Sequence, residues 1–296
     1  PLPSVRPTSS IRRTRLAVAL AGALPLAALA QDTTIRSEGT STPAATLDAV
    51  QVTAQRRVEN IQDVPVSITT LDAEKLGVLG SGGTDIRFLS GRVPSLNIES
   101  SYGRAFPRFY IRGLGNTDFD LNASQPVSLI YDDVVLENPL LKGFPVFDIA
   151  GVEVLRGPRS AVYGADAIGG VVQIFTRQGS GQGLAPAVRF GVGSNGTFER
   201  SLNLSGGNGQ TRFNLGAAMD ETQGIDATRD SFGANGDDDA YRNRSLSLNL
   251  AHRFNDRLEA GVSALDQRGE LEFDDTFDGF QPTVDFQLSS ISGFVD

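Results

Sequence analysis

The second half of the chain alternates between apolar and polar residues with a period of two. Leu246 and Leu248 share one parity, whereas Ser245 and Ser247 share the other. This period is that of a β-strand with one apolar and one polar face. The runs approach or exceed the roughly 9–11 residues that a tilted membrane-spanning strand needs. The pattern predicts five clear strands between residues 188 and 265, and the tail predicts a sixth less clearly.

The connections between these strands differ in length. Residues 206–209 and 255–256 form tight turns, whereas residues 221–240 form a much longer loop. Short turns on one side and long loops on the other are typical of outer-membrane barrels. We therefore expect the start of an antiparallel transmembrane β-barrel over residues 187–296. The strand pattern alone leaves open a passive porin-like barrel or a soluble secreted β-protein, because soluble sheets also alternate.

Residues 1–30 have the composition of a secretory signal peptide. They contain four arginines and no acidic residue, and an apolar run ends in Ala28-Leu29-Ala30. The run is shorter than the roughly 20 residues of a membrane-spanning helix, and small residues suit cleavage after Ala30. We therefore expect an exported protein with a cleaved leader. Residues 31–46 are rich in Thr, Ser and Gly, which predicts a flexible leash within 31–57.

The composition argues against several classes of function. The chain has no cysteine, one histidine (His252) and a net charge of −9 at pH 7. It therefore offers no disulfide framework and little for a zinc site or a catalytic triad. A nucleic-acid partner needs a basic surface, which this acidic chain lacks. We predict that the protein is not an enzyme and binds no organic cofactor.

The long loop after residue 221 is acidic. Calcium takes roughly six to eight oxygen ligands, so clustered carboxylates could order this loop around an ion. The spacing is not that of a helix–loop–helix calcium site, and a solvated acidic loop is the alternative. The candidate ligands are Asp226, Asp230, Asp237, Asp238 and Asp239.

Between residues 58 and 178 the pattern changes to short mixed elements. Glycine-rich loops such as residues 113–125 connect them, and loops of that length in a compact domain are usually functional. This segment predicts an α+β domain, which a linker at 179–186 would join to the barrel. The predicted helices are 72–76, 84–90 and 159–163, and the predicted strands are 64–69, 96–98, 108–112, 127–131, 152–155 and 171–176.

Three stretches carry a family resemblance. Residues 48–54, Asp-Ala-Val-Gln-Val-Thr-Ala, follow the leash, and their periodicity alone favours the first strand of the next domain. Ile111-Arg112-Gly113 and residues 152–172, which begin Val-Glu-Val-Leu-Arg-Gly-Pro, resemble signature stretches of a plug domain. Together with the amphipathic strands behind them, these stretches resemble the TonB-dependent outer-membrane receptors over nearly the whole chain. The resemblance changes the interpretation of residues 48–54 from a first strand to a TonB box.

The resemblance implies a plug at 58–178 inside a barrel of about 22 strands in the complete receptor. The partner protein TonB would capture the box by strand addition and pull it, driven by the inner-membrane proton gradient. The box residues would be Asp48, Ala49, Val50, Gln51, Val52, Thr53 and Ala54. The plug would be locked by Arg112, Gly113, Arg156, Gly157 and Pro158, with both arginines buried and paired with barrel glutamates.

The resemblance also implies a ligand that binds at the plug apex and the barrel loops. Residues 111–133 resemble siderophore receptors, whereas residues 156–176 and the acidic loop resemble cobalamin receptors. We favour a ferric siderophore, because those receptors are the commoner class, and keep cobalamin as the alternative. The expected ligand-facing residues are Tyr102, Arg104, Phe106, Asn116, Asp118 and Phe119.

Overall fold

This computed structural model describes ten ranges of the chain: 50–53, 56–79, 85–100, 103–104, 106–118, 120, 122–143, 146–226, 238–274 and 282–296. The expected signal peptide and most of the leash lie outside these ranges. Among the described residues, no helix combines the length and the apolar character that crossing a bilayer would require.

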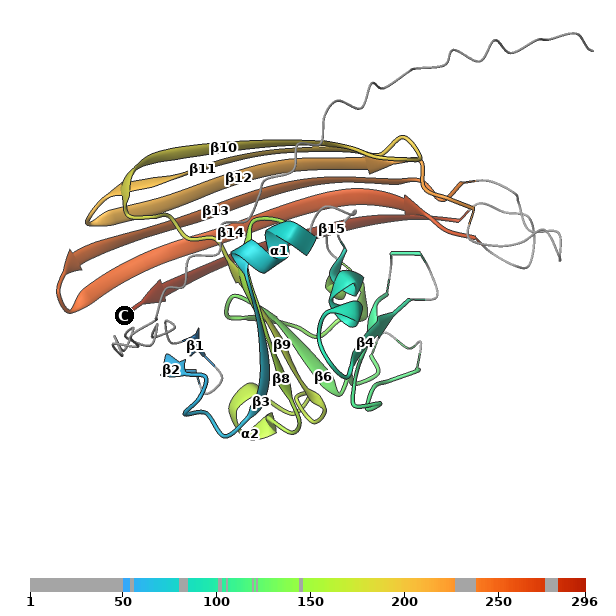
Figure 1. The fold of residues 1–296 in the computed structure, drawn as a ribbon, viewed down its shortest axis with the longest axis horizontal. Coiled ribbons are helices and arrows are strands. Elements are labelled where there is room, and N and C mark those ends of the chain that lie inside the picture. The colour runs from blue at the N-terminus through green and yellow to red at the C-terminus, as the bar shows by residue number, and fades with distance from the viewer. Residues whose placement is uncertain are drawn as a thin grey trace, which may run out of the picture. The chain divides into compact units, whose positions relative to one another are not determined.

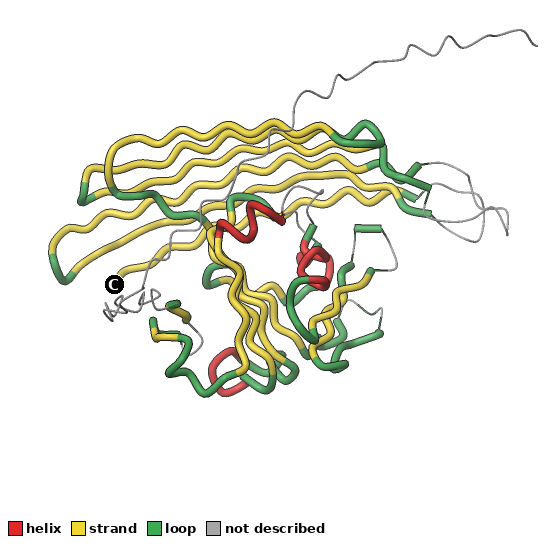
Figure 2. The backbone as a smooth tube through the Cα atoms, viewed as in Figure 1, coloured by secondary structure: helices red, strands yellow, loops and turns green. Residues whose placement is uncertain are grey.

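The described residues between 182 and 295 form one sheet of six long strands, each antiparallel to the next and ordered as in the sequence (Figures 1 and 2). The less clearly predicted sixth strand is present. The strands are β10 (Gln182–Val192), β11 (Phe198–Asn208), β12 (Thr211–Thr222), β13 (Tyr241–Asn255), β14 (Leu258–Glu272) and β15 (Thr283–Val295). With lengths of 11 to 15 residues, they meet the length that the sequence predicted for spanning strands.

The apolar face of this sheet is exposed and its polar face is buried, which is the reverse of the arrangement in a water-soluble protein. Leu246 is 58% exposed, whereas Asn243 and Ser245 on the opposite parity of β13 are buried. Burial of polar residues and exposure of large apolar ones argue against a soluble sandwich, in which the apolar face is the covered one. The sheet therefore has the exposure pattern of a membrane-barrel wall, and its six described strands do not close on themselves. We call this sheet the wall.

Residues 50–176 form a separate α+β domain around a five-stranded sheet. Its strand order is β3-β8-β9-β6-β7, with β6 and β9 parallel and the other pairs antiparallel. The sheet strands are β3 (Ser67–Asp72), β6 (Val127–Tyr131), β7 (Val134–Leu136), β8 (Ile149–Arg156) and β9 (Gly170–Thr176). Two small hairpin-like pairs join β1 (Gln51–Val52) to β2 (Glu59–Asn60) and β4 (Leu96–Glu99) to β5 (Arg108–Ile111).

Four short helices complete this domain, which we call the plug. They are α1 (Ala73–Leu79), the 3₁₀ helices η1 (Ile86–Gly91) and η2 (Pro139–Lys142), and α2 (Ser160–Tyr163). The apolar runs of β6, β8 and β9 are buried on both faces of the sheet, as continuous apolar strands must be. One core cluster contains Leu89, Leu129 and Ile174, and a second contains Leu155 and Val171.

Several boundaries differ from the expected ones: the strand expected at 64–69 is β3 at 67–72, and the strand expected at 152–155 extends over 149–156. β10 begins at Gln182, inside the expected 179–186 linker, because residues 182–186 already pair with β11. Their Gly and Pro content concealed the strand, and Pro186 is tolerated because β10 lies at the sheet edge, where one row of N–H groups needs no partner. The expected helix at 84–90 is the 3₁₀ helix η1, and β7 and η2 were not predicted.

Candidate functional site

The described part of the predicted TonB box lies against the plug. Gln51 and Val52 pair antiparallel with Asn60 and Glu59. The Ile61 N–H donates to the Val50 carbonyl at 2.9 Å. Val52 is 1% exposed and belongs to the core cluster that contains Leu155 and Val171. A β-prone segment is thus held by two backbone pairings and one buried side chain.

A polar contact fixes the end of this segment. The Thr53 N–H and hydroxyl donate to the carboxylate of Glu153, each at 3.1 Å. The Tyr163 hydroxyl donates to the Thr53 carbonyl at 3.1 Å and lies 3.3 Å from Gln173 Oε1. Burial raises the pKa of Glu153, and the hydrogen bonds from Thr53 oppose this rise. We call Glu153, Tyr163 and Gln173 the seat of the segment.

Sequence reasoning missed the seat. Glu153 is a charged residue inside the apolar run Val152-Glu153-Val154-Leu155, and a carboxylate in a buried strand requires hydrogen-bond donors. The sequence pattern therefore indicated that Glu153 needs a hydrogen-bond donor. It did not indicate that the donor is Thr53, 100 residues away. The box assignment of Val50, Gln51, Val52 and Thr53 stays a prediction. Asp48, Ala49 and Ala54 lie outside the described residues.

A cavity of about 700 Å³ lies between the plug and the loop ends of strands β10 to β14. The guanidinium of Arg104 lies over the ring of Tyr241, 4.2 Å from its centroid. Phe106 packs against the cluster that contains Tyr241 and Leu271. The cavity therefore presents a cation stacked on an aromatic ring, which suits a ligand with anionic or planar groups. The other charged lining residues are Arg87, Arg189, Glu199, Asp220, Glu221, Asp239 and Glu272.

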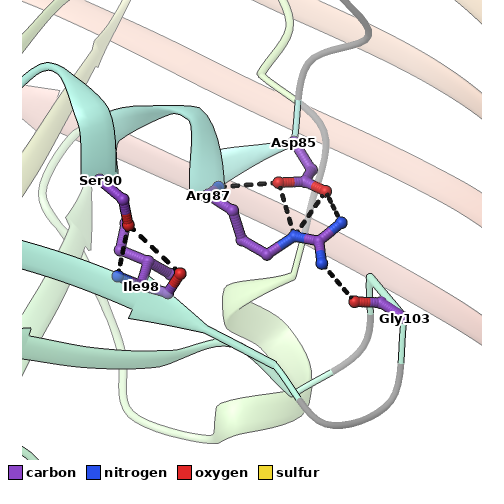
Figure 3. A network of polar contacts seen from close by, with 5 residues as sticks. All are labelled: Asp85, Arg87, Ser90, Ile98 and Gly103. Carbon is purple, nitrogen blue, oxygen red and sulfur yellow. Dashed lines mark hydrogen bonds and ion pairs between the residues drawn. The ribbon is translucent and has the colours of Figure 1, made fainter. Parts of the chain in front are cut away.

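Arg87 fixes the loop that carries Arg104 (Figure 3). Its Nη2 and Nε donate to Asp85 Oδ2 at 2.6 and 2.9 Å, and its Nη1 donates to the Gly103 carbonyl at 2.6 Å. Asp85 also accepts the Arg87 N–H and thereby caps η1. In the same view the Ser90 hydroxyl bonds the backbone of Ile98, which ties η1 to β4. A charge-assisted, two-point contact of this kind holds the cavity rim in one geometry.

Two other expected ligand-facing residues, Asn116 and Asp118, lie elsewhere. Asn116 donates through Nδ2 to the Ser124 carbonyl and accepts the Asp118 N–H, so both residues brace their own loop. Neither lines the 700 Å³ cavity. Tyr102 and Phe119 lie outside the described residues.

The two expected lock arginines are not buried in this chain. Arg112 is exposed in a left-handed turn with φ of 53°, and Arg156 is half-buried. Arg156 donates to Ser67 Oγ, to the Pro94 carbonyl and to the Ile68 carbonyl, all of them plug acceptors. No described wall strand covers either arginine, so their expected burial and pairing with barrel glutamates stay a prediction. A Cβ placed at Gly157 would lie 4.0 Å from Arg112 Nη1, so the turns 112–113 and 157–158 are neighbours.

The acidic loop is described only at its two ends. The Asp226 N–H donates to Asp238 Oδ1 at 3.1 Å, which links the two ends. Asp230 and Asp237 lie outside the described residues. Within the described ranges, no group of three or more His, Cys, Asp or Glu side chains has the arrangement of a metal site. The calcium site stays a prediction.

The plug and the strands behind it both match known proteins. A family model described as the TonB-dependent Receptor Plug Domain matches residues 60–171. The vitamin B12 transporter BtuB of Photobacterium profundum is 27% identical over 275 residues, which cover 90% of this chain and 41% of the relative. The chain thus spans about two fifths of that relative's length.

Solved structures agree on the fold. The ferric yersiniabactin uptake receptor FyuA of Yersinia pestis superposes with a TM-score of 0.59 at 26% identity, covering 69% of this chain and 32% of the receptor. FpvA of Pseudomonas aeruginosa, solved with a bound pyoverdine, gives a TM-score of 0.62 over 83% of this chain and 33% of that one. At 16% identity the second likeness shows the fold alone. The predicted order of an α+β plug followed by antiparallel barrel strands is confirmed.

Proposed function

We propose that this chain, which belongs to the TonB-dependent receptors, carries the coupling segment and the gate for energised uptake across a bacterial outer membrane. The ligand is a scarce, large compound, and a ferric siderophore is favoured. In this proposal the exposed apolar face of the wall contacts lipid, and a cleaved leader directs export. The chain performs no covalent chemistry.

The observation that carries this proposal is the seat of residues 50–53. The segment is β-prone and is held on the plug by a few hydrogen bonds to Glu153 and Tyr163. Each such bond contributes only about 1–3 kcal/mol, so an external sheet edge can compete for the segment. A partner that pairs with these residues and pulls would act directly on β8, because Glu153 belongs to that strand.

Deletion of Asp48–Ala54 in the complete receptor tests the coupling role. Energised uptake should be lost while ligand binding to intact cells stays near the wild-type level, because the cavity lies on other residues. Deletion of seven leash residues, 36–42, is the matched control and should leave uptake intact. Uptake that survives the first deletion would show that the segment does not couple energy.

The cavity supports a siderophore as ligand. Arg104 and Arg189 line it, and the catecholate, hydroxamate or carboxylate oxygens that chelate ferric iron make such ligands good partners for guanidinium groups. Arg87 also lines the cavity but is bonded to Asp85 and Gly103, and five carboxylates share the lining, so a siderophore would bind at the guanidinium of Arg104. The siderophore receptors among the solved structures point the same way. Cells that depend on the complete receptor should take up radioactive iron supplied as the siderophore of iron-starved cultures.

Cobalamin is the second candidate, because the related sequences include vitamin B12 transporters at 27% and 28% identity. Uptake of radiolabelled cyanocobalamin in the same cells separates the two ligands. Uptake of cobalamin without iron would replace the favoured ligand but keep the transport mechanism.

A further inference from the structure

One carboxylate of the plug touches three successive strands of the wall. Asp148 lies directly before β8, and its side chain is 2% exposed. Its Oδ1 accepts from Asn203 Nδ2 on β11 at 2.8 Å, and its Oδ2 accepts from Asn214 Nδ2 on β12 at 2.6 Å. The hydroxyl of Ser247 on β13 also donates to Oδ2.

The wall is shaped to receive this carboxylate. Asn203, Gly216 and Ser247 face one another across β11, β12 and β13 in one row of the sheet. A Cβ at Gly216 would lie 2.9 Å from Asp148 Oδ2 and 2.8 Å from the ring of Phe147. The glycine therefore leaves a dent, flanked by two hydrogen-bond donors, that a larger residue would fill.

A second contact lies beside the first, where the plug chain leaves β9. Asn249 Nδ2 on β13 donates to Thr176 Oγ1 at 3.0 Å and to the Arg177 carbonyl at 3.1 Å. The Arg177 N–H donates to the Asp148 carbonyl, and Arg177 Nε lies 3.8 Å from Asp148 Oδ1. Two plug segments far apart in sequence are thereby fixed to the same patch of wall.

The contact satisfies a group that is costly to bury. Burial raises the pKa of Asp148, while the Ser247 hydrogen bond, the charge of Arg177 and the Asn214 hydrogen bond oppose the rise. A buried carboxylate without these donors would be strongly destabilising. The donors on the wall are neutral, so water can hydrate them when the carboxylate is absent.

We infer that Asp148 is the clamp that fastens the plug to the first strands of the wall, and that this part of the plug stays in place during transport. The inference rests on the proposed transport function. The coupling segment, residues 50–53, is held by a different residue, Glu153, in the middle of β8. The clamp and the seat are therefore separate sets of contacts.

Replacement of the clamp in the complete receptor tests its role in closing the barrel. Asp148→Ala should make cells roughly tenfold or more sensitive to a glycopeptide antibiotic that is too large for general porins. The substitution removes charged hydrogen bonds between plug and wall, so a larger fraction of receptors would have a released plug at any time. Receptor amount and siderophore binding should stay unchanged. Asp133→Ala, which removes an exposed aspartate near β6, is the control and should leave resistance intact. Wild-type resistance in Asp148→Ala at equal receptor levels would overturn the clamp.

Engineered disulfides test whether the clamped region stays in place, and these 296 residues contribute no cysteine of their own. Thr176→Cys with Asn249→Cys tethers the plug beside the clamp, and the oxidised receptor should retain energised uptake. If oxidation blocks uptake and a reductant restores it, the plug leaves the wall there and the inference is wrong.

A second pair separates this inference from the proposed function. Thr53→Cys with Glu153→Cys tethers the coupling segment to its seat, so oxidation should stop uptake and reduction should restore it. Uptake that persists with this tether would refute the coupling role of residues 50–53, whereas the result at Thr176 and Asn249 decides the clamp alone. Alkylation of free thiols measures the tethered fraction in both pairs.

Discussion

Glu153 receives both hydrogen bonds that Thr53 can donate, so a single carboxylate fixes the end of segment 50–53, the proposed coupling segment, to the middle of a plug strand. The two residues are 100 positions apart, and the backbone around Val52 is paired as well. Release of the segment therefore removes a defined set of contacts, which substitutions can weaken one at a time.

Glu153→Gln should loosen the coupling segment more than Tyr163→Phe does. The first change replaces a charged acceptor of two hydrogen bonds, and the second removes one neutral hydrogen bond worth about 1 kcal/mol. A spin label at Gln51 in the complete receptor should become mobile in Glu153→Gln and intermediate in Tyr163→Phe. Equal mobility in both variants and the wild type would mean that the pairing with residues 59–60 holds the segment alone.

Arg104→Ala should weaken siderophore binding by about tenfold, because the cavity loses its stacked cation over Tyr241. Arg104→Lys should restore only part of the affinity, since an ammonium group lacks the planar fork of a guanidinium. Binding of radioactive ferric siderophore to whole cells measures both. Arg92→Ala, at the exposed end of η1, is the matched control; an equal loss there would point to a general charge effect.

Gly170→Ala should destabilise the plug by about 3 kcal/mol or more. Gly170 has a φ of 153°, and a Cβ there would lie 2.3 Å from the Leu155 carbonyl oxygen. Gly91→Ala is the control, because nothing lies within 4 Å of a Cβ at that position. Thermal unfolding of the purified receptors measures the difference, and an unchanged midpoint in Gly170→Ala would contradict the packing described for β8 and β9.

Lys142 should give the receptor a pH-dependent stability. The side chain is 1% exposed, its Nζ donates to the Val127 carbonyl, and burial lowers its pKa to about 8. Between pH 8 and its unfolded pKa of 10.5 the unfolded chain binds more protons, so the free energy of unfolding rises with pH, by about 3 kcal/mol in all. Lys142→Met should remove this rise, as denaturant midpoints from pH 7 to 10 would show. Lys75→Met, at an exposed site, should keep it.

Much of the fold could be predicted from local patterns. The period of two in β13 placed Leu246 outside and Ser245 inside, and the continuous apolar run of residues 127–131 matched β6 residue for residue. Gly164, with φ of 94°, ends α2 where the pattern placed it. These features depend on neighbours in the sequence, which is why periodicity and capping residues reveal them.

The sites were harder, because they depend on residues brought together from distant positions. Arg104 lines the large cavity, but its partner Tyr241 lies on a wall strand and carries no local signal. Asp148 and Gly216 are unremarkable in sequence, and only the register of β11, β12 and β13 brings the dent and the carboxylate together. The burial of the lock arginines depends likewise on distant strands and stays a prediction.

The face of the wall that contacts the plug carries amides and hydroxyls, and these groups influence how wall and plug can separate. Asn214 and Asn243 are fully buried, and the Oδ1 atom of each has no partner among the described residues. Water that reaches these positions would find groups ready to bond it, so a hydrogen bond that the wall gives up there is exchanged for one to water. Apolar surface resists separation elsewhere, because Leu265 and Leu288 of the wall belong to the same core cluster as Leu129 of the plug. The polar positions can therefore hydrate at little cost, whereas the apolar positions hold the plug against the wall.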